Sequence, residues 1–245
     1  MSAATAMIKA EGKLLVRSPA VMLWSIILPI TATIVLAAIP GLREPSEDLG
    51  GVSFFQVFQP ILVMFALAIL AVQGLPDVLT RYREMGVLKR LRTTPASPAL
   101  LLLAQLVLTM AVSLLCLVVM LVVPPMLGAS SPDNLVGFVL AYLLGSWAFL
   151  GLGMLIASLF RNAKVAAGFG TVLFFVLQFF AGLWIQRPLM PDWMRHISDL
   201  TPSGATIQGM LDSSAGNWPS LLHICVMIGW GVITSLLAVR LFKWE

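Results

Sequence analysis

The sequence predicts an all-α integral membrane protein with six membrane-spanning helices and both termini in the cytoplasm. Of its 245 residues, 59% are hydrophobic and only 11% are charged, whereas an ordinary soluble domain has about 25% charged residues. The charges leave six uncharged runs of 22 to 40 residues, and about 20 apolar residues are enough for a helix to cross the hydrocarbon core. A soluble domain is therefore excluded, and a single transmembrane domain over residues 1-245 is expected.

The uncharged runs place the spans at about 20-40, 54-75, 99-124, 135-160, 165-186 and 219-240. The longest run, 93-132, would need two minimal helices to hold a seventh span. It begins and ends with proline and glycine breakers, which leave one uniformly apolar stretch from Ala99 to Val123. The expected number of spans therefore stays at six.

The basic residues are distributed unequally between the two sides of these spans. Twelve of the 15 Lys and Arg residues fall in the termini, in segment 76-98 and in connection 161-164, and three fall on the other side. Because cytoplasmic loops carry an excess of Lys and Arg, the larger group is placed inside. The sequence therefore predicts a multi-pass protein of the inner (plasma) membrane. This topology explains the pI near 9.4, and no nucleic-acid partner is expected.

The N-terminal residues and the two cysteines also have simple interpretations. Val21 to Ile39 is longer than the apolar core of a signal peptide, which favours an uncleaved first helix. Cleavage near Ala37 would leave the other loops on the same sides. Cys116 and Cys225 both fall inside spans, where we expect small buried apolar side chains and no disulfide.

Catalysis and self-powered transport are both disfavoured. All formal charges fall in the loops and ends of this assignment, whereas ion-coupled carriers use acids or bases within the membrane. The chain contains no G-x-x-x-x-G-K-[ST] loop that would cradle the phosphates of ATP. His196 and His223 are the only histidines, so no metal site is expected. We expect His223 to be a neutral imidazole bonded within the bundle, and a hydrolase using Ser203 or His223 is a third hypothesis.

The segment 76-98 has the strongest functional pattern. Tyr82, Met85 and Leu88 share one helical face, and basic residues fill the gaps between them. A helix with this pattern could lie under the lipid headgroups or dock into a groove on a soluble partner. The spacing alone leaves both possibilities open.

Three stretches carry a resemblance to a known family. Residues 84-98 read E-M-G-V-L-K-R-L-R-T-T-P-A-S-P, residues 151-167 read G-L-G-M-L-I-A-S-L-F-R-N-A-K-V-A-A, and residues 184-210 contain P-D-W and L-T-P. In this order and spacing they resemble type-2 ATP-binding-cassette (ABC-2) transporter permeases. Those proteins are about this long and have six spans.

The resemblance implies that segment 76-98 contains a coupling helix that contacts a separate ATPase subunit. It implies contact residues Tyr82, Arg83, Glu84, Met85, Gly86, Leu88, Lys89, Arg90 and Arg92. Gly86 inside a helix would cost about 1 kcal/mol, so it marks either close approach to a partner or a helix start. Residues 7-17 are similar to the amphipathic elbow helix of the family, and they would also serve as a surface anchor.

The resemblance further implies the partners. A second permease copy or a homologous permease would pair with this chain in the lipid bilayer. This chain would bind no cofactor and would have no catalytic residues, because ATP and Mg would be bound by the ATPase subunit. Gly153 and Ala157 would permit close approach between helices, either between subunits or within the chain.

The extracellular segment 187-218 is too polar to span and too apolar for a bare loop. Interfacial or re-entrant helices before the last span fit both properties. Such helices would form either a lid on the exit side of a transport path or a packed cap.

Polar and aromatic residues in the outer halves of spans two and five are candidates for a substrate path. They are Gln56, Gln59, Phe55, Phe58, Gln178 and Phe179. Hydrogen bonding between helices would also explain the glutamines. The expected function is export of an amphipathic or hydrophobic substrate, such as a drug, lipid or glycan-like molecule. The alternative is a non-transporting membrane scaffold that recruits a soluble partner through its basic cytoplasmic helix.

Overall fold

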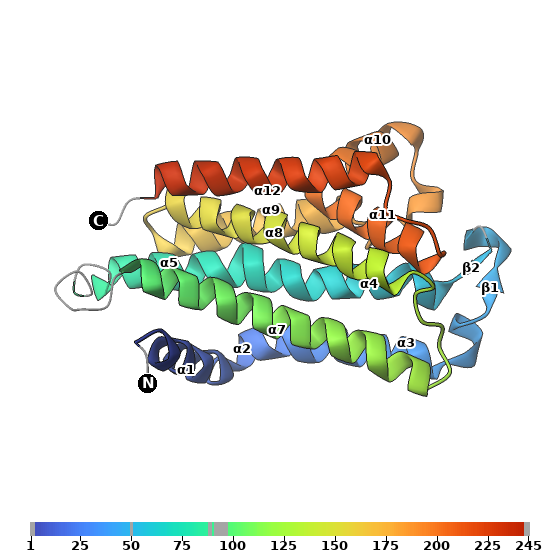
Figure 1. The fold of residues 1–245 in the computed structure, drawn as a ribbon, viewed down its shortest axis with the longest axis horizontal. Helices are drawn as coiled ribbons and strands as arrows, with labels where there is room; N and C mark the ends of the chain where they lie inside the picture. Colours follow the sequence, from blue (N-terminus) through green and yellow to red (C-terminus); the bar gives the residue numbers. More distant parts are fainter. Residues whose placement is uncertain (1–2, 50, 88–89, 91–97, 243–245) are drawn as a thin grey trace.

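The computed structural model describes residues 3–49, 51–87, 90 and 98–242 and forms a bundle of long helices (Figure 1). Within this part of the chain, six helices are long and apolar enough to cross a membrane. They are Pro19–Ala38, Phe54–Glu84, Ala99–Met126, Leu135–Leu159, Ala163–Phe180 and Leu221–Leu241. The predicted number and order of spans are therefore confirmed.

The first span follows a separate N-terminal helix, α1 (Ala3–Val16). It consists of α2 (Pro19–Met22), a π-helical turn η1 (Leu23–Ile27) and α3 (Leu28–Ala38). A short connection then contains η2 (Pro40–Leu42), β1 (Pro45–Ser46), η3 (Glu47–Leu49) and β2 (Val52–Ser53). The two strands pair antiparallel, with Pro45 opposite Ser53, and the second strand leads directly into the second span.

The second span consists of α4 (Phe54–Ala68), a π-helical turn η4 (Ile69–Gly74) and α5 (Leu75–Glu84). It begins with a capping box, in which Ser53 and Gln56 exchange two hydrogen bonds between side chains and backbone. The predicted span ended at residue 75, but the helix continues to Glu84. Pro76 lies in the first turn of α5, where a missing N–H group is tolerated.

The remaining helices are α7 (Pro98–Met126), α8 (Leu135–Leu159), α9 (Ala163–Phe180), η5 (Arg187–Leu189), α10 (Asp192–Leu200), α11 (Pro202–Ser214) and α12 (Leu221–Leu241). Four of them begin at a side chain that accepts a hydrogen bond from the N–H group three residues later. These N-caps are Asn134, Asn162, Thr201 and Ser220.

The fifth span is shorter than predicted, because α9 ends at Phe180 and not near residue 186. Gly182 has a φ of +92°. Its N–H donates to the Phe179 carbonyl at 3.3 Å, and the Leu183 N–H donates to the Gln178 carbonyl at 3.2 Å. This is a Schellman ending, in which glycine takes a left-handed conformation that most other residues avoid.

The second span is the centre of the bundle. Of its most apolar window, 83% of the residues are buried, compared with 22% for the first span and 28% for the last. The exposed apolar faces of the outer helices suit contact with lipid. Cys116 is buried as predicted, but Cys225 is exposed, because it lies on peripheral α12.

The loops are grouped at the two ends of the bundle (Figure 1). The N-terminal helix α1, the end of α5 and the end of α12 lie at one end, and the β1–β2 hairpin, α10 and α11 lie at the other. This grouping agrees with the predicted sidedness of the loops, and the assignment of one end to the cytoplasm stays a prediction. The helices expected in segment 187-218 are α10 and α11, and their role as lid or cap stays open.

Candidate functional site

The end of α5 is held tightly by the ends of two other spans. The Arg83 guanidinium donates to the carbonyls of Ala157 at 3.0 Å and Phe160 at 3.1 Å, at the end of α8. The Glu84 carboxylate accepts from the Ala163 N–H at 2.8 Å, at the start of α9. Each charge complements the dipole of the helix end that it contacts. The charged side chains predicted to contact an ATPase thus connect spans two, four and five.

The chain turns sharply directly after α5. Gly86 has a φ of +68°, and its N–H donates to the Arg83 carbonyl at 3.0 Å. A Cβ atom at Gly86 would meet nothing within 4 Å. Of the two explanations for Gly86, the helix boundary is therefore supported, and a continuous helix through residues 81-92 is wrong at this point.

The other predicted coupling residues are placed only in part. Met85 and Arg90 are exposed, and the Arg90 N–H donates to the Gly86 carbonyl at 3.1 Å. Leu88, Lys89 and Arg92 lie outside the described residues. Their contact with an ATPase stays a prediction.

Tyr82 points away from the solvent toward a buried acid. Its hydroxyl donates to the Glu11 carboxylate of α1, 2.8 Å from each oxygen. The Gln105 amide of α7 donates to the same carboxylate. Burial raises the pKa of the Glu11 carboxyl group, while the hydrogen bonds from Tyr82 and Gln105 lower it. The sequence pattern marks neither Glu11 nor Gln105 as a site residue.

Two π-helical turns divide the first and second spans, and each ends at a Leu-Pro pair. The Leu28 N–H donates to the Leu23 carbonyl and the Leu75 N–H donates to the Leu70 carbonyl, five residues back in each case. The next residue in each span is proline, which has no N–H group to donate. The backbone therefore loses one helical hydrogen bond at each turn, and the two turns contact each other.

The carbonyl groups of the second turn fit against glycines. A Cβ atom at Gly153 of α8 would overlap the Ala71 carbonyl oxygen, and one at Gly170 of α9 would lie 2.5 Å from the Val72 carbonyl oxygen. Gly153 therefore serves close packing within the chain. Ala157, also fully buried, packs near Leu75 in the same region.

A groove of about 530 Å³ lies beside these turns, between the first span and α9. Its walls carry aromatic rings, and three polar side chains line it as well. The aromatic residues are Trp24, Phe65, Phe174, Phe175 and Trp184, and the polar residues are Gln73, Asp77 and Thr171. Asp77 pairs with Arg81 at 2.8 Å. An aromatic groove with a polar end can hold an amphipathic molecule.

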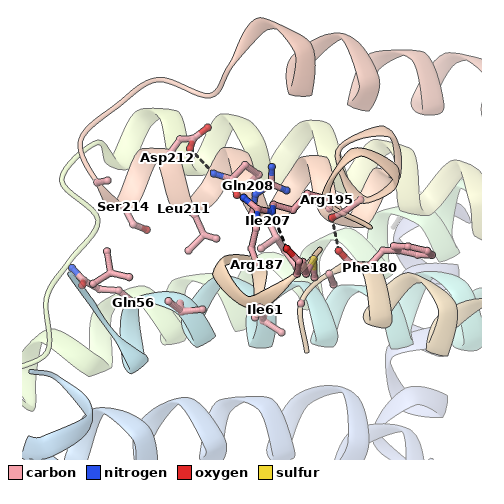
Figure 2. Close-up of a pocket in the computed structure, with 18 residues that line it drawn as sticks. Gln56, Ile61, Phe180, Arg187, Arg195, Ile207, Gln208, Leu211, Asp212 and Ser214 are labelled. Carbon is pink, nitrogen blue, oxygen red and sulfur yellow. Dashed lines mark hydrogen bonds between the residues drawn. The ribbon is translucent and has the colours of Figure 1, made fainter. Parts of the chain in front are cut away.

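A second cavity of about 400 Å³ lies at the other end of the bundle, between α4 and α11 (Figure 2). Gln56, Arg187, Arg195 and Gln208 line it together with apolar side chains such as Ile61. Figure 2 shows Arg187, Arg195 and Gln208 close together above Ile61. The cavity is therefore lined by charged, amide and apolar side chains together.

Most of the predicted substrate-path residues lie in the packing of the bundle. Phe55 is fully buried, and the Gln59 amide donates to the Met120 carbonyl of α7 at 2.7 Å. Phe58 stacks on Phe54, and Phe179 packs edge-on against Phe180. Only Gln56 lines the cavity of Figure 2.

Gln178 is fully buried, and neither of its amide atoms has a hydrogen-bond partner among the described residues. Buried polar groups normally have partners, so this amide is the most unusual of the predicted residues. The role of all six in a substrate path stays a prediction.

The polar residues near the last span form a structural network. The His223 imidazole contacts the Ser220 hydroxyl at 2.8 Å and the Asp199 carboxylate at 3.1 Å, and Arg187 pairs with Asp199 at 2.6 Å. Ser203 instead lies 3.3 Å from the Thr201 hydroxyl. These contacts place His223 within the bundle and do not join it to Ser203. In the described part of the chain, no three His, Cys, Asp or Glu side chains are grouped as a metal site.

Comparisons of the sequence with known proteins identify its family. A family model described as ABC-2 type transporter matches residues 2–213. The chain belongs to this family. It is therefore a multi-pass membrane permease of the ABC-2 type, the membrane subunit of a transporter.

Three relatives of this ABC-2 permease match different shares of its sequence. The YvfS protein of Bacillus subtilis (strain 168), named as a transport permease, is 26% identical over 231 residues, which cover 94% of this chain and 92% of YvfS. ABC transporter G family member 45 of Oryza sativa subsp. japonica is 27% identical over 104 residues, and member 39 of Arabidopsis thaliana is 31% identical over 84 residues. The last two matches cover 42% and 34% of this chain but only 8% and 6% of the plant proteins.

Proposed function

We propose that this permease exports an amphipathic or hydrophobic substrate with energy from a separate ATPase subunit, which binds ATP and Mg²⁺. The observation that carries the proposal is the path of the second span. Its α5 segment begins beside the aromatic groove at Asp77 and ends at Glu84, where the segment predicted to couple to an ATPase begins. A displacement of that segment would therefore reach the groove directly.

The contacts of α5 support a concerted movement of several spans. Arg83 connects α5 to the end of α8, and Glu84 connects it to the start of α9. Residues of α9 and Asp77 of α5 both line the groove. A tilt of α5 would therefore move both of these sides of the groove together. Rigid-body movement of packed helices is a common mechanism of such transitions.

A second permease copy is expected to cover the groove. The groove is open along exposed apolar residues of the first span and α9, among them Trp24, Val172 and Phe175. A copy or a homologous permease packed on these faces would close the groove into a path between two subunits. The polar Gln73 and Asp77 and the aromatic walls would then suit an amphipathic substrate such as a drug, lipid or glycan-like molecule.

Co-purification tests the ATPase partnership. The tagged full-length chain is purified from the membranes of cells that produce it, and co-purifying proteins are identified by mass spectrometry. An ATPase with a phosphate-cradling loop is expected. Leu88→Asp should remove it, and the matched control Leu189→Asp, at the opposite end of the bundle where Leu189 is exposed, should retain it. Recovery of only a partner without that loop would favour the scaffold alternative and contradict the proposal.

A further inference from the structure

The buried acid on α1 has no role in the proposed function so far. Glu11 accepts hydrogen bonds from Tyr82 of α5 and from Gln105 of α7. These partners are 71 and 94 positions away in the sequence, so one carboxylate joins three separate helices. Tyr82 lies two residues before Glu84, the last residue of α5. The contact therefore fixes the position of the α5 end relative to α1 and α7.

A buried carboxylate costs more free energy than is needed only to hold α1 against α7. The Glu11 residue is 7% exposed, and among the described residues no Lys or Arg forms an ion pair with it. Burying an acid without a cation is costly, whereas an apolar side chain could pack α1 on α7 at no such cost. The acid therefore suits a contact that must be specific and reversible better than one that must only be stable.

The surroundings of Glu11 would allow this contact to open. A cavity of about 120 Å³ lies next to it, lined by Ser18 and Thr109 as well as by Gly74 and Asp77. Gly74 and Asp77, near the junction of η4 and α5, also line the aromatic groove. The cavity and the groove thus adjoin at this junction, where α5 is not packed on every side. A π-helical turn is a frequent feature of functional sites.

We propose that Glu11 is a positioning residue of the transport cycle, which holds α5 in one of two positions and releases it when the coupling segment moves. In the position described here, Tyr82 and Gln105 occupy the carboxylate. In the released position, α5 pivots about η4, Tyr82 leaves, and the Glu11 carboxylate is solvated in the enlarged cavity. The proposal rests on the proposed function, because the release is driven by the ATPase subunit. The contact itself is a property of this chain alone.

Spin-label distance measurements on the full chain in lipid nanodiscs test the contact. Labels are placed at Lys13→Cys on α1 and Arg81→Cys on α5, both exposed positions outside the predicted ATPase contacts, in a background of Cys116→Ala and Cys225→Ser. The parent should give one narrow distance. Glu11→Ala and Tyr82→Phe should each raise a second population about tenfold, the factor expected when a hydrogen bond to a charged group is lost. Lys9→Gln, which removes an exposed charge from the same helix, should change nothing.

An exchange variant separates positioning from simple packing. Glu11→Gln combined with Gln105→Glu restores one carboxylate and one amide at the same two places, and it should return the narrow distance. Unchanged distances in Glu11→Ala and Tyr82→Phe would overturn the proposal. An exchange variant as broad as Glu11→Ala would also overturn it, because specific pairing would then not matter. Tyr82→Phe keeps the ring and serves if Glu11→Ala does not fold.

The release step is tested in the complex with the ATPase subunit. With ATP and vanadate present, the parent should shift to the second distance that Glu11→Ala already shows without nucleotide. An unshifted parent that still traps nucleotide would contradict release. Failure to recover an ATPase would instead contradict the proposed function, and the distances in the chain alone would still decide the contact.

Discussion

The first and second spans contain the same local backbone device in different surroundings. Each has a π-helical turn that ends at Leu-Pro. In the second span the turn is buried, and Gly153 and Gly170 receive its carbonyl groups. In the first span, Leu23, Trp24 and Ile27 are 48%, 53% and 49% exposed. Proline therefore shapes the backbone in both spans. The neighbouring helices determine whether the π-helical turn is buried or exposed.

A threonine completes the device in both spans. The Thr33 and Thr80 hydroxyls donate to the carbonyls of Pro29 and Pro76, four residues back, at 2.8 and 2.7 Å. Each bond gives a buried hydroxyl group a partner within its own helix, directly after the turn.

The largest effect is expected where a backbone carbonyl meets a glycine. Gly153→Ala would place a Cβ atom against the Ala71 carbonyl, and no side-chain rotation can relieve that overlap. We expect a loss of about 1–3 kcal/mol, measured by thermal unfolding of the detergent-solubilised chain. Gly168→Ala, on α9 with nothing within 4 Å, should be neutral or gain up to about 1 kcal/mol. Equal effects would show that η4 is not packed as described.

The next largest difference in stability is expected between the variants of the two prolines, Pro76 and Pro29. Pro76→Ala supplies an N–H group and allows the turn to shorten to an ordinary helix, which would withdraw the carbonyl groups from Gly153 and Gly170. We expect a loss of about 1 kcal/mol in thermal unfolding, in the usual range for point variants. Pro29 is itself buried, but it follows a turn whose side chains are largely exposed, so Pro29→Ala should cost less than Pro76→Ala. The reverse order would refute the difference between the two turns.

An effect no larger than that of Pro76→Ala is expected for the threonine hydroxyl. Thr80 is fully buried, so Thr80→Val should cost about 1 kcal/mol through the lost bond to the Pro76 carbonyl. Thr171 makes the same type of bond, 2.9 Å from the Ala167 carbonyl, on an exposed face. Thr171→Val should be close to neutral in the same unfolding assay. A neutral Thr80→Val would mean that α5 does not need this bond.

The smallest effect is a pH dependence at the cavity next to η4. Burial raises the pKa of the Glu11 carboxyl group above its ordinary value of 4.5. The folded chain therefore binds this proton more tightly than the unfolded chain, and the resulting stability is lost as the pH rises through the folded-state value. The unfolding temperature of Glu11→Gln relative to the parent should rise with pH above about 4.5. A difference that stays constant with pH would show that Glu11 does not titrate differently on folding.

The spans could be predicted because each of them has to be a long uncharged run. This constraint is local, so counting the residues between charges was enough to locate all six spans. The continuation of the second span past Pro76 could not be predicted in this way, since proline near a span end normally indicates a boundary. Here the π-helical turn absorbs the proline, and glycines on two other helices make room for that turn.

The site could be predicted only as a region. The basic pattern marked segment 76-98, but it did not show that Arg83 and Glu84 contact the ends of α8 and α9. Such contacts depend on which helix ends meet in space. The aromatic groove was missed for the same reason, because Trp24, Gln73 and Asp77 come from two spans, and Asp77 was assigned to a loop beyond the second span.

One carboxylate connects the second span to the fifth. Glu84 is the last residue of α5, and it accepts a hydrogen bond from Ala163, the first residue of α9, 79 positions further along the chain. A movement of the α5 end would therefore reach α9 through this hydrogen bond, in addition to the packing of Gly170 against the Val72 carbonyl. A neighbouring subunit that packs on α9 would then change its position without contacting α5.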